Sequence, residues 1–282
     1  MNLEDTRASR RARGGSRRHP KTHAQHRSGR ATLAGPGWAI AGVGAVLFDK
    51  DGTIVDLHRY WGEIIRRRAR AIVAHHGWSE SLIPEICLGM GLSPAGLLLP
   101  EGPTGLASRE EIIHALCARL ATRGLVCSER VLAGVFVAVH ERFLPEIGGF
   151  LELLPGVAAF AGALKGAGVR TAIVTSDTVA STGASLELLG VGQLFDLVVG
   201  RDSTIEPKIS GVPARRAMEG LGVGGGETIC LGDAPMDVVM GREAGCRATV
   251  AVATGQIPFE ALRKQTPYVA LSLHEITVTA GG

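Results

Sequence analysis

Short runs of apolar residues alternate with stretches of helical character, and this alternation limits the possible folds more than any other feature of the chain. Strands are expected at residues 45–48, 169–174, 197–199, 228–231, 248–252 and 268–271. Helices are expected between them, at residues 157–166, 179–189, 213–221 and 235–244. Alternation of this kind produces βαβ units with right-handed crossovers. The sequence therefore predicts an α/β fold built on a parallel sheet.

One long stretch, residues 58–149, interrupts this rhythm. It has helical patterns at residues 60–75, 109–122 and 129–143 and no strand signal. In the first pattern, apolar residues fall on one face of a helix. We therefore expect an all-α insertion at 58–149 in an α/β core made of residues 41–57 and 150–282. The hinges would be residues 55–58 and Gly148–Gly149.

The N-terminal segment has a different composition from the rest of the chain. Residues 1–38 contain nine Arg or Lys and two acids, whereas the remainder contains 21 bases and 25 acids. With few apolar side chains to bury, residues 1–40 are expected to be a disordered basic arm. Such an arm could contact nucleic acid or an acidic partner, but a solvated tail or an upstream start-codon artefact is the favoured interpretation.

Two further features bear on location. No apolar run approaches the roughly 18 residues that a membrane-spanning helix requires, so no membrane association is expected. The five cysteines form no CxxC pair, which fits buried thiols in a reducing compartment. Together these features predict a cytoplasmic protein.

Polar residues follow several of the expected strands directly. Asp49 and Asp51 follow the first, Thr175 the second, and Asp233 the fourth, while Lys208 comes shortly after the third. In an open parallel sheet, ligands bind outside the carboxyl ends of the strands, so these side chains could converge on one crevice. Taken singly, each has an ordinary explanation as a turn, capping or surface residue. Their joint occurrence favours a catalytic site.

These residues resemble the motifs of the haloacid dehalogenase-like (HAD) superfamily, over about residues 44–275. The first motif is Asp49-Lys50-Asp51-Gly52-Thr53, and the fourth is Gly232-Asp233-Ala234-Pro235-Met236-Asp237. Thr175 and Lys208 stand for the second and third. The third departs from the frequent Lys-Pro-x-Pro pattern, because Lys208 is followed by Ile209-Ser210-Gly211. The resemblance implies a Rossmann-like parallel sheet with an inserted α-helical cap.

The resemblance also implies roles for individual residues. Asp49 would be the nucleophile that forms an aspartyl-phosphate, and Asp51 the general acid and base. Thr175, Lys208 and a backbone N–H of Ser176 or Asp177 would hold the phosphoryl group. The expected cofactor is Mg²⁺, which would be held by Asp49, the Asp51 main-chain carbonyl and Asp233, with Asp237 acting through water or as an orienting residue.

The helical insertion would supply further substrate contacts. His58, Arg59 and Tyr60 enter it beside the expected site and are the candidates for binding substrate. The arginine run of Arg66, Arg67, Arg68 and Arg70 is interpreted as a solvated helix face.

Within the superfamily, the chain most resembles the phosphoglycolate phosphatase-like group, and this resemblance implies a phosphatase that acts on a small phosphorylated metabolite such as phosphoglycolate or a sugar phosphate. A dehalogenase would have no use for Asp51, and a phosphonatase would need a cap lysine, which residues 58–149 lack. Two alternatives stay open. One is a β-phosphoglucomutase-like enzyme, and the other is a non-catalytic binding protein that uses the basic arm.

Overall fold

The computed structural model describes residues 29–281 and is built around a six-stranded parallel sheet. The strand order is β5-β4-β3-β6-β7-β8, with every neighbouring pair parallel. The strands are β3 (Ala45–Phe48), β4 (Arg170–Val174), β5 (Leu197–Val199), β6 (Thr228–Gly232), β7 (Ala248–Val252) and β8 (Val269–Ala270). The predicted α/β fold is confirmed, and each expected strand is present to within two residues at either end.

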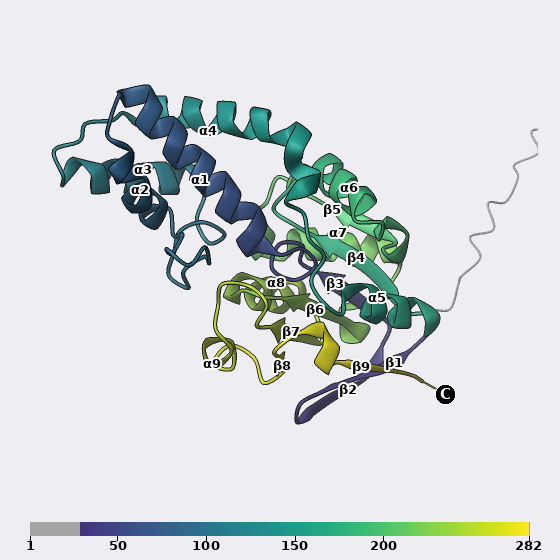
Figure 1. Cartoon of the computed structure of the whole chain (residues 1–282). Coiled ribbons are helices and arrows are strands. Elements are labelled where there is room, and N and C mark those ends of the chain that lie inside the picture. The colour runs from purple at the N-terminus through teal and green to yellow at the C-terminus, as the bar shows by residue number, and fades with distance from the viewer. Residues whose placement is uncertain (1–28, 282) are drawn as a thin grey trace, which may run out of the picture.

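Helices cover both faces of this sheet (Figure 1). They are α5 (Val157–Gly166), α6 (Val179–Leu188), α7 (Val212–Leu221) and α8 (Pro235–Ala244). Side chains alternate between the two faces of a strand, so Val46 and Phe48 join a cluster with Phe160 of α5. Ala45 and Leu47 instead join a cluster with α7 and α8. All four β3 side chains are fully buried, which is typical of a central parallel strand.

A second group of helices lies apart from the sheet (Figure 1). It contains α1 (Leu57–His76), α2 (Ile83–Gly89), α3 (Arg109–Ala121) and α4 (Glu129–Phe143). Asp56 caps α1 by accepting hydrogen bonds from the His58 and Arg59 N–H groups, and Gly77 ends it in the left-handed conformation. These helices share a hydrophobic cluster of their own. The division into two domains at residues 58 and 149 stays a prediction.

The predicted disorder of residues 1–40 is wrong for its last part. Residues 31–35 form β1 (Ala31–Gly35), which pairs antiparallel with β2 (Trp38–Val43) and with β9 (Thr277–Ala280). Leu33 and Ile40 are buried in the main core, so this segment does bury apolar surface. β2 also crosses the predicted boundary between residues 40 and 41. Residues 1–28 of the predicted arm lie outside the described residues.

Two observations bear on the expected location. Among residues 29–281, no helix has both the length and the apolar character needed to cross a bilayer. All five cysteines are free thiols, and two of them, Cys87 and Cys230, are buried.

Candidate active site

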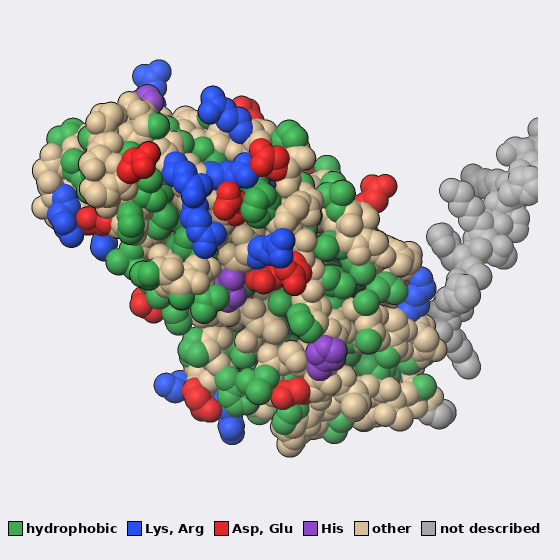
Figure 2. Space-filling view, viewed as in Figure 1, with side chains coloured by type: hydrophobic (Ala, Val, Ile, Leu, Met, Phe, Trp, Pro, Cys, Tyr) green, Lys and Arg blue, Asp and Glu red, His purple; other side chains and the backbone are tan. Residues whose placement is uncertain are grey.

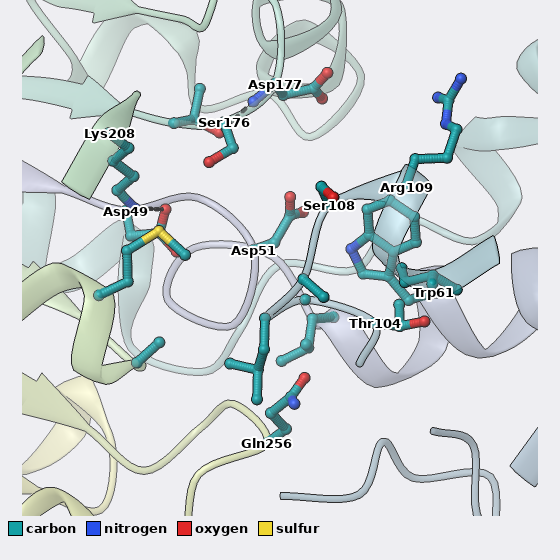
Figure 3. A pocket seen from close by; sticks show the side chains of 18 of the residues that line it. Asp49, Asp51, Trp61, Thr104, Ser108, Arg109, Ser176, Asp177, Lys208 and Gln256 are labelled. Carbon is teal, nitrogen blue, oxygen red and sulfur yellow. Dashed lines mark hydrogen bonds and ion pairs between the residues drawn. The ribbon is translucent and has the colours of Figure 1, made fainter. Parts of the chain in front are cut away.

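The segments that follow β3, β4 and β6 meet at one end of the sheet, together with the short 3₁₀ helix at Lys208–Ser210. They line one cavity of about 760 Å³. Its lining includes Asp49, Asp51, Thr175, Ser176, Asp177, Lys208, Asp233 and Asp237. Figure 3 shows Lys208 and Asp49 directed toward each other on one side and Trp61 and Arg109 on the other. The strand ends therefore bring together residues that are up to 188 positions apart in the chain.

Three carboxylates form the centre of this site. One side-chain oxygen each from Asp49, Asp233 and Asp237 lies within 4.8 Å of the others. Asp233 and Asp237 are only 4% and 2% exposed. Lys208 Nζ donates a hydrogen bond to Asp49 and forms an ion pair with Asp237 Oδ1 at 2.6 Å. One ammonium group thus faces three acids.

Burial and mutual repulsion shape the acid–base properties of this cluster. Desolvation, with a contribution from Asp237, raises the pKa of Asp49 to about 6, although Lys208 opposes the shift. Desolvation and the charges of Asp49 and Asp237 raise the pKa of Asp233 well above its usual range. Burial disfavours the charged form of Lys208, but Asp237 and Asp49 outweigh it and raise the pKa of that lysine. Burial is therefore the main reason that these two pKa values are raised; repulsion among the acids adds to it, and a single lysine does not offset both effects.

This donor set fits a hard divalent cation. Mg²⁺ binds carboxylate oxygens and usually keeps several waters, and the cluster offers buried carboxylates beside an open cavity. A cation among these oxygens would stabilise the charged carboxylates, which burial and mutual repulsion disfavour. Asp49, Asp233 and Asp237 could therefore hold a metal ion. The Asp51 carboxylate lies outside this cluster.

Lys50 was overlooked in the sequence, where it appears as a spacer between two aspartates. Its side chain is 1% exposed, and its Nζ lies 2.9 Å from Asp51 Oδ1 and 3.3 Å from Asp177 Oδ2. Tyr60 lies against it, with the ring centroid 5.7 Å from Nζ. Burial, followed by the charge of Asp51, raises the pKa of Tyr60 to about 12. Lys50 therefore fixes Asp51 beside the start of α6.

The loop after β4 is arranged largely by its own hydrogen bonds. Thr175 Oγ1 accepts a hydrogen bond from the Asp177 N–H at 3.1 Å, and the Asp177 carboxylate accepts from the Thr178 N–H and the Ser181 hydroxyl. The Asp177 N–H, one of the two groups expected to hold a phosphoryl group, is thus already engaged. Thr175 and Ser176 remain at the cavity wall.

The structure does not bring His58 and Arg59 to the cavity. His58 Nδ1 accepts a hydrogen bond from the Leu98 N–H, and Arg59 bonds to Glu152 and to the Gly149 carbonyl. Both side chains are held by protein groups near the start of α1 and do not line the cavity. Tyr60, the third candidate, does line it.

The four arginines of the run on α1 lie in different surroundings. Figure 2 shows basic side chains gathered over the helical region with acidic ones among them. Arg66 and Arg67 pair with Glu63, and Arg70 is exposed. Arg68, however, is 3% exposed and lines the cavity. The interpretation of the whole run as a solvated face is wrong for Arg68, because α1 turns this one position toward α4 and the cavity.

Comparison with known proteins places this arrangement in a family. The family model described as "haloacid dehalogenase-like hydrolase" matches residues 43–245 of this chain. "Probable phosphatase IndB" of Dickeya dadantii is 35% identical over 155 residues, which cover 54% of this chain and 66% of that protein. The plasmid-encoded phosphoglycolate phosphatase of Cupriavidus necator is 31% identical over 202 residues, 71% of this chain and 77% of that protein.

A solved structure shares the fold. The crystal structure of a predicted phosphoglycolate phosphatase from Haemophilus somnus superposes with a TM-score of 0.64 at 17% identity. The match covers 83% of this chain and 96% of the other.

Proposed function

This chain belongs to the haloacid dehalogenase-like hydrolases and is a phosphatase of that family, and we propose that it is a Mg²⁺-dependent enzyme that hydrolyses a small-metabolite phosphate monoester through an aspartyl-phosphate on Asp49. The observation that carries the proposal is the position of Asp49. Its carboxylate lies at the cavity wall, in contact with Lys208 and within metal-binding reach of Asp233 and Asp237.

The chemistry needs positive charge at this point. A carboxylate that approaches a phosphate monoester is repelled by roughly 4 kcal/mol per pair of unit charges at 4 Å and an effective dielectric near 20. Lys208 supplies one compensating charge beside Asp49. When bound by Asp49, Asp233 and Asp237, Mg²⁺ would supply further positive charge against the phosphoryl oxygens. The Asp51 main-chain carbonyl is proposed as an additional ligand.

The first step transfers the phosphoryl group to the protein. An Asp49 carboxylate oxygen forms a bond to phosphorus while the bond from phosphorus to the leaving oxygen breaks. Asp51 gives its proton to that oxygen, so that the product leaves as a neutral alcohol. Thr175 and the Ser176 N–H, at the cavity wall beside the start of α6, hold the phosphoryl oxygens.

The second step returns the protein to its starting state. Asp51, now a carboxylate, takes a proton from a water whose oxygen attacks phosphorus, and the bond to Asp49 breaks to release inorganic phosphate. Lys50, 2.9 Å from Asp51 Oδ1, holds the Asp51 carboxyl group in position for this transfer. The helical region over the cavity would act as a cap that excludes bulk water.

Replacement of the nucleophile tests the proposal. With Mg²⁺ and p-nitrophenyl phosphate, Asp49→Asn should lower the rate of phosphate release by about 10³-fold or more, since the covalent route is lost. Glu260→Gln, an exposed acid on α9 (Phe259–Leu262), is the matched control and should keep wild-type activity. Undiminished hydrolysis by Asp49→Asn would exclude the nucleophile assignment.

The same assay separates the two alternatives. A β-phosphoglucomutase-like enzyme would return the phosphoryl group to a sugar phosphate and release little inorganic phosphate. A non-catalytic binding protein would consume no ester at all. Release of one phosphate for each ester consumed would support hydrolysis.

A further inference from the structure

Arg68 is a buried cation whose guanidinium has no polar partner among residues 29–281. It forms no hydrogen bond and no ion pair there, and its Nε is fully enclosed without an acceptor. Its neighbours on α1 differ, because Arg66 and Arg67 both pair with Glu63. A buried charge without a counterion is costly, so the arrangement needs an explanation.

Packing accounts for only part of it. The Arg68 guanidinium lies 4.0 Å from the ring centroid of Phe136 on α4 and 6.0 Å from that of Trp61. A desolvated cation–π contact holds the side chain in place but satisfies none of its N–H groups. The terminal N–H groups of the guanidinium, which are not enclosed as Nε is, therefore remain available at the cavity that Arg68 helps to line.

The charges around Arg68 are mostly of its own sign. Burial lowers the pKa of Arg68 to about 10, with a further contribution from Arg109. The same arginines, with Arg201, act with burial to lower the pKa of His140, against an opposing effect of Asp177. Arg109, Arg201 and His140 all line the cavity with Arg68.

Of the acids that line the cavity, all except Glu110 have partners within the described part of the protein or belong to the carboxylate cluster. Asp51 and Asp177 pair with Lys50. Glu111 accepts a hydrogen bond from the N–H group of Ser108, the residue that caps α3. Glu110, beside it, is exposed in the first turn of the same helix. None of these acids forms an ion pair with Arg68. The counterion that Arg68 lacks would therefore come from a ligand.

We propose that Arg68 binds a second anionic group of the substrate, so that the enzyme acts on phosphate monoesters that also carry a carboxylate or another phosphate. This inference rests on the proposed function for the identity of the transferred group. Asp49 and Lys208 would receive the reacting phosphoryl group at the sheet, and Arg68 would hold the other end of the molecule at α1. A guanidinium is suited to this task because its N–H groups match a carboxylate or phosphate in pairs.

Binding to an inactive variant tests the subsite without any turnover. In Asp49→Asn, calorimetry would compare three ligand series with one, two or three carbons beyond the phosphonate: alkyl phosphonates, carboxyalkyl phosphonates and bisphosphonates. We expect the second anion to tighten binding at least tenfold at one or more lengths. The series that shows this gain identifies carboxylate or phosphate as the second group.

Changes at Arg68 should then remove the gain in affinity that the second anionic group provides. Asp49→Asn/Arg68→Met should bind the doubly anionic ligand no more tightly than the matched alkyl phosphonate. Arg68→Gln, which keeps N–H donors without the charge, provides the same test if the methionine variant does not fold. Arg70→Met, on the exposed side of α1, is the control and should keep the gain. Equal binding of all three series, or a gain that survives both Arg68 changes, would overturn the proposal.

Kinetics distinguish this failure from failure of the proposed function. With Asp49 intact, the ratio of kcat/KM for 2-phosphoglycolate or a sugar bisphosphate to that for p-nitrophenyl phosphate should fall at least tenfold in Arg68→Met and stay constant in Arg70→Met. A wild-type protein that hydrolyses no ester contradicts the proposed function, while the binding series still decides the role of Arg68.

Discussion

Two glycines allow the backbone to approach the Asp233 carboxylate closely. Gly52 has a φ of 89°, and a Cβ there would lie 2.4 Å from Asp233 Oδ2. A Cβ on Gly255 would lie 1.7 Å from the same oxygen. Thr53 Oγ1 also donates to Asp233 Oδ1 at 3.1 Å. The position of this acid is therefore fixed by contacts from two loops.

A methyl group at position 255 should displace Asp233. We expect Gly255→Ala to raise the Mg²⁺ concentration needed for half-maximal activity by tenfold or more, because the substituted carbon cannot coexist with Oδ2. Gly226→Ala is the control, since a Cβ there meets nothing within 4 Å. Mg²⁺ titration of both variants checks this, and identical Mg²⁺ dependence would show that the close approach has no role in metal binding.

The raised pKa values predict how Mg²⁺ stabilisation depends on pH. Asp49, with a pKa of about 6, and Asp233, shifted in the same direction, bind protons more tightly when folded than when unfolded. Metal-free stability should therefore fall as pH rises from about 4 to 6, where only the folded state keeps the Asp49 proton. Mg²⁺ competes with these protons, so its effect should grow over the same interval.

Thermal unfolding provides the measurement. The increase in Tm caused by a fixed Mg²⁺ concentration should be small at pH 5 and clearly larger at pH 7.5. Asp233→Asn should lose most of this increase in Tm at both pH values. An increase that is independent of pH, or one that persists in Asp233→Asn, contradicts this account of the cluster.

Individual site residues differed in how well they could be predicted. The residues that the sequence placed at strand ends, such as Asp49 and Asp233, do line one cavity, because parallel strands share an edge. Their catalytic roles remain predictions. Lys50, Gly255 and Arg68 were missed because their significance depends on contacts with residues elsewhere in the fold. His58 and Arg59 were placed by proximity in sequence, which does not determine side-chain direction.

At the level of secondary structure, the elements with the strongest local signals were the predictable ones. Buried parallel strands appear as continuous apolar runs, and α3, for example, begins with a Ser108–Glu111 capping box. The antiparallel sheet of β1, β2 and β9 was missed. Its first strand follows a basic segment, and its third lies more than 240 residues away. The local signal in β1 is short: apolar Ala31 and Leu33 flank polar Thr32, and the structure buries both apolar side chains.

This small sheet should contribute to stability although it lies outside the active site. Leu33 is fully buried in the main core, so Leu33→Ala should lower the free energy of unfolding by about 2–5 kcal/mol. Val126→Ala, at a position 86% exposed, should change it by less than about 0.5 kcal/mol. Urea unfolding of both variants measures the difference. Equal stabilities would mean that residues 31–35 are not part of the cooperative core.

At the scale of the whole molecule, the active-site cavity depends on both the sheet and the helical region. Asp49, Thr175, Lys208 and Asp233 come from the sheet side, and Trp61, Arg68 and Arg109 from the helices. Gln256, in the segment after β7, donates hydrogen bonds to the carbonyls of Leu99 and Gly102, which belong to the helical region. The two regions are thus in contact at the wall of the cavity.

The central claim is that Asp49 becomes phosphorylated in this cavity and that Asp51 then activates water. p-Nitrophenolate leaves without needing a proton, so Asp51→Asn should still form the aspartyl-phosphate but hydrolyse it slowly. Rapid mixing of this variant with p-nitrophenyl phosphate and Mg²⁺, followed by acid quench and peptide mass spectrometry, measures both steps. We predict a burst of about one p-nitrophenolate per active site, with the phosphoryl group on Asp49. No burst, or a phosphoryl group on any other residue, would contradict the account.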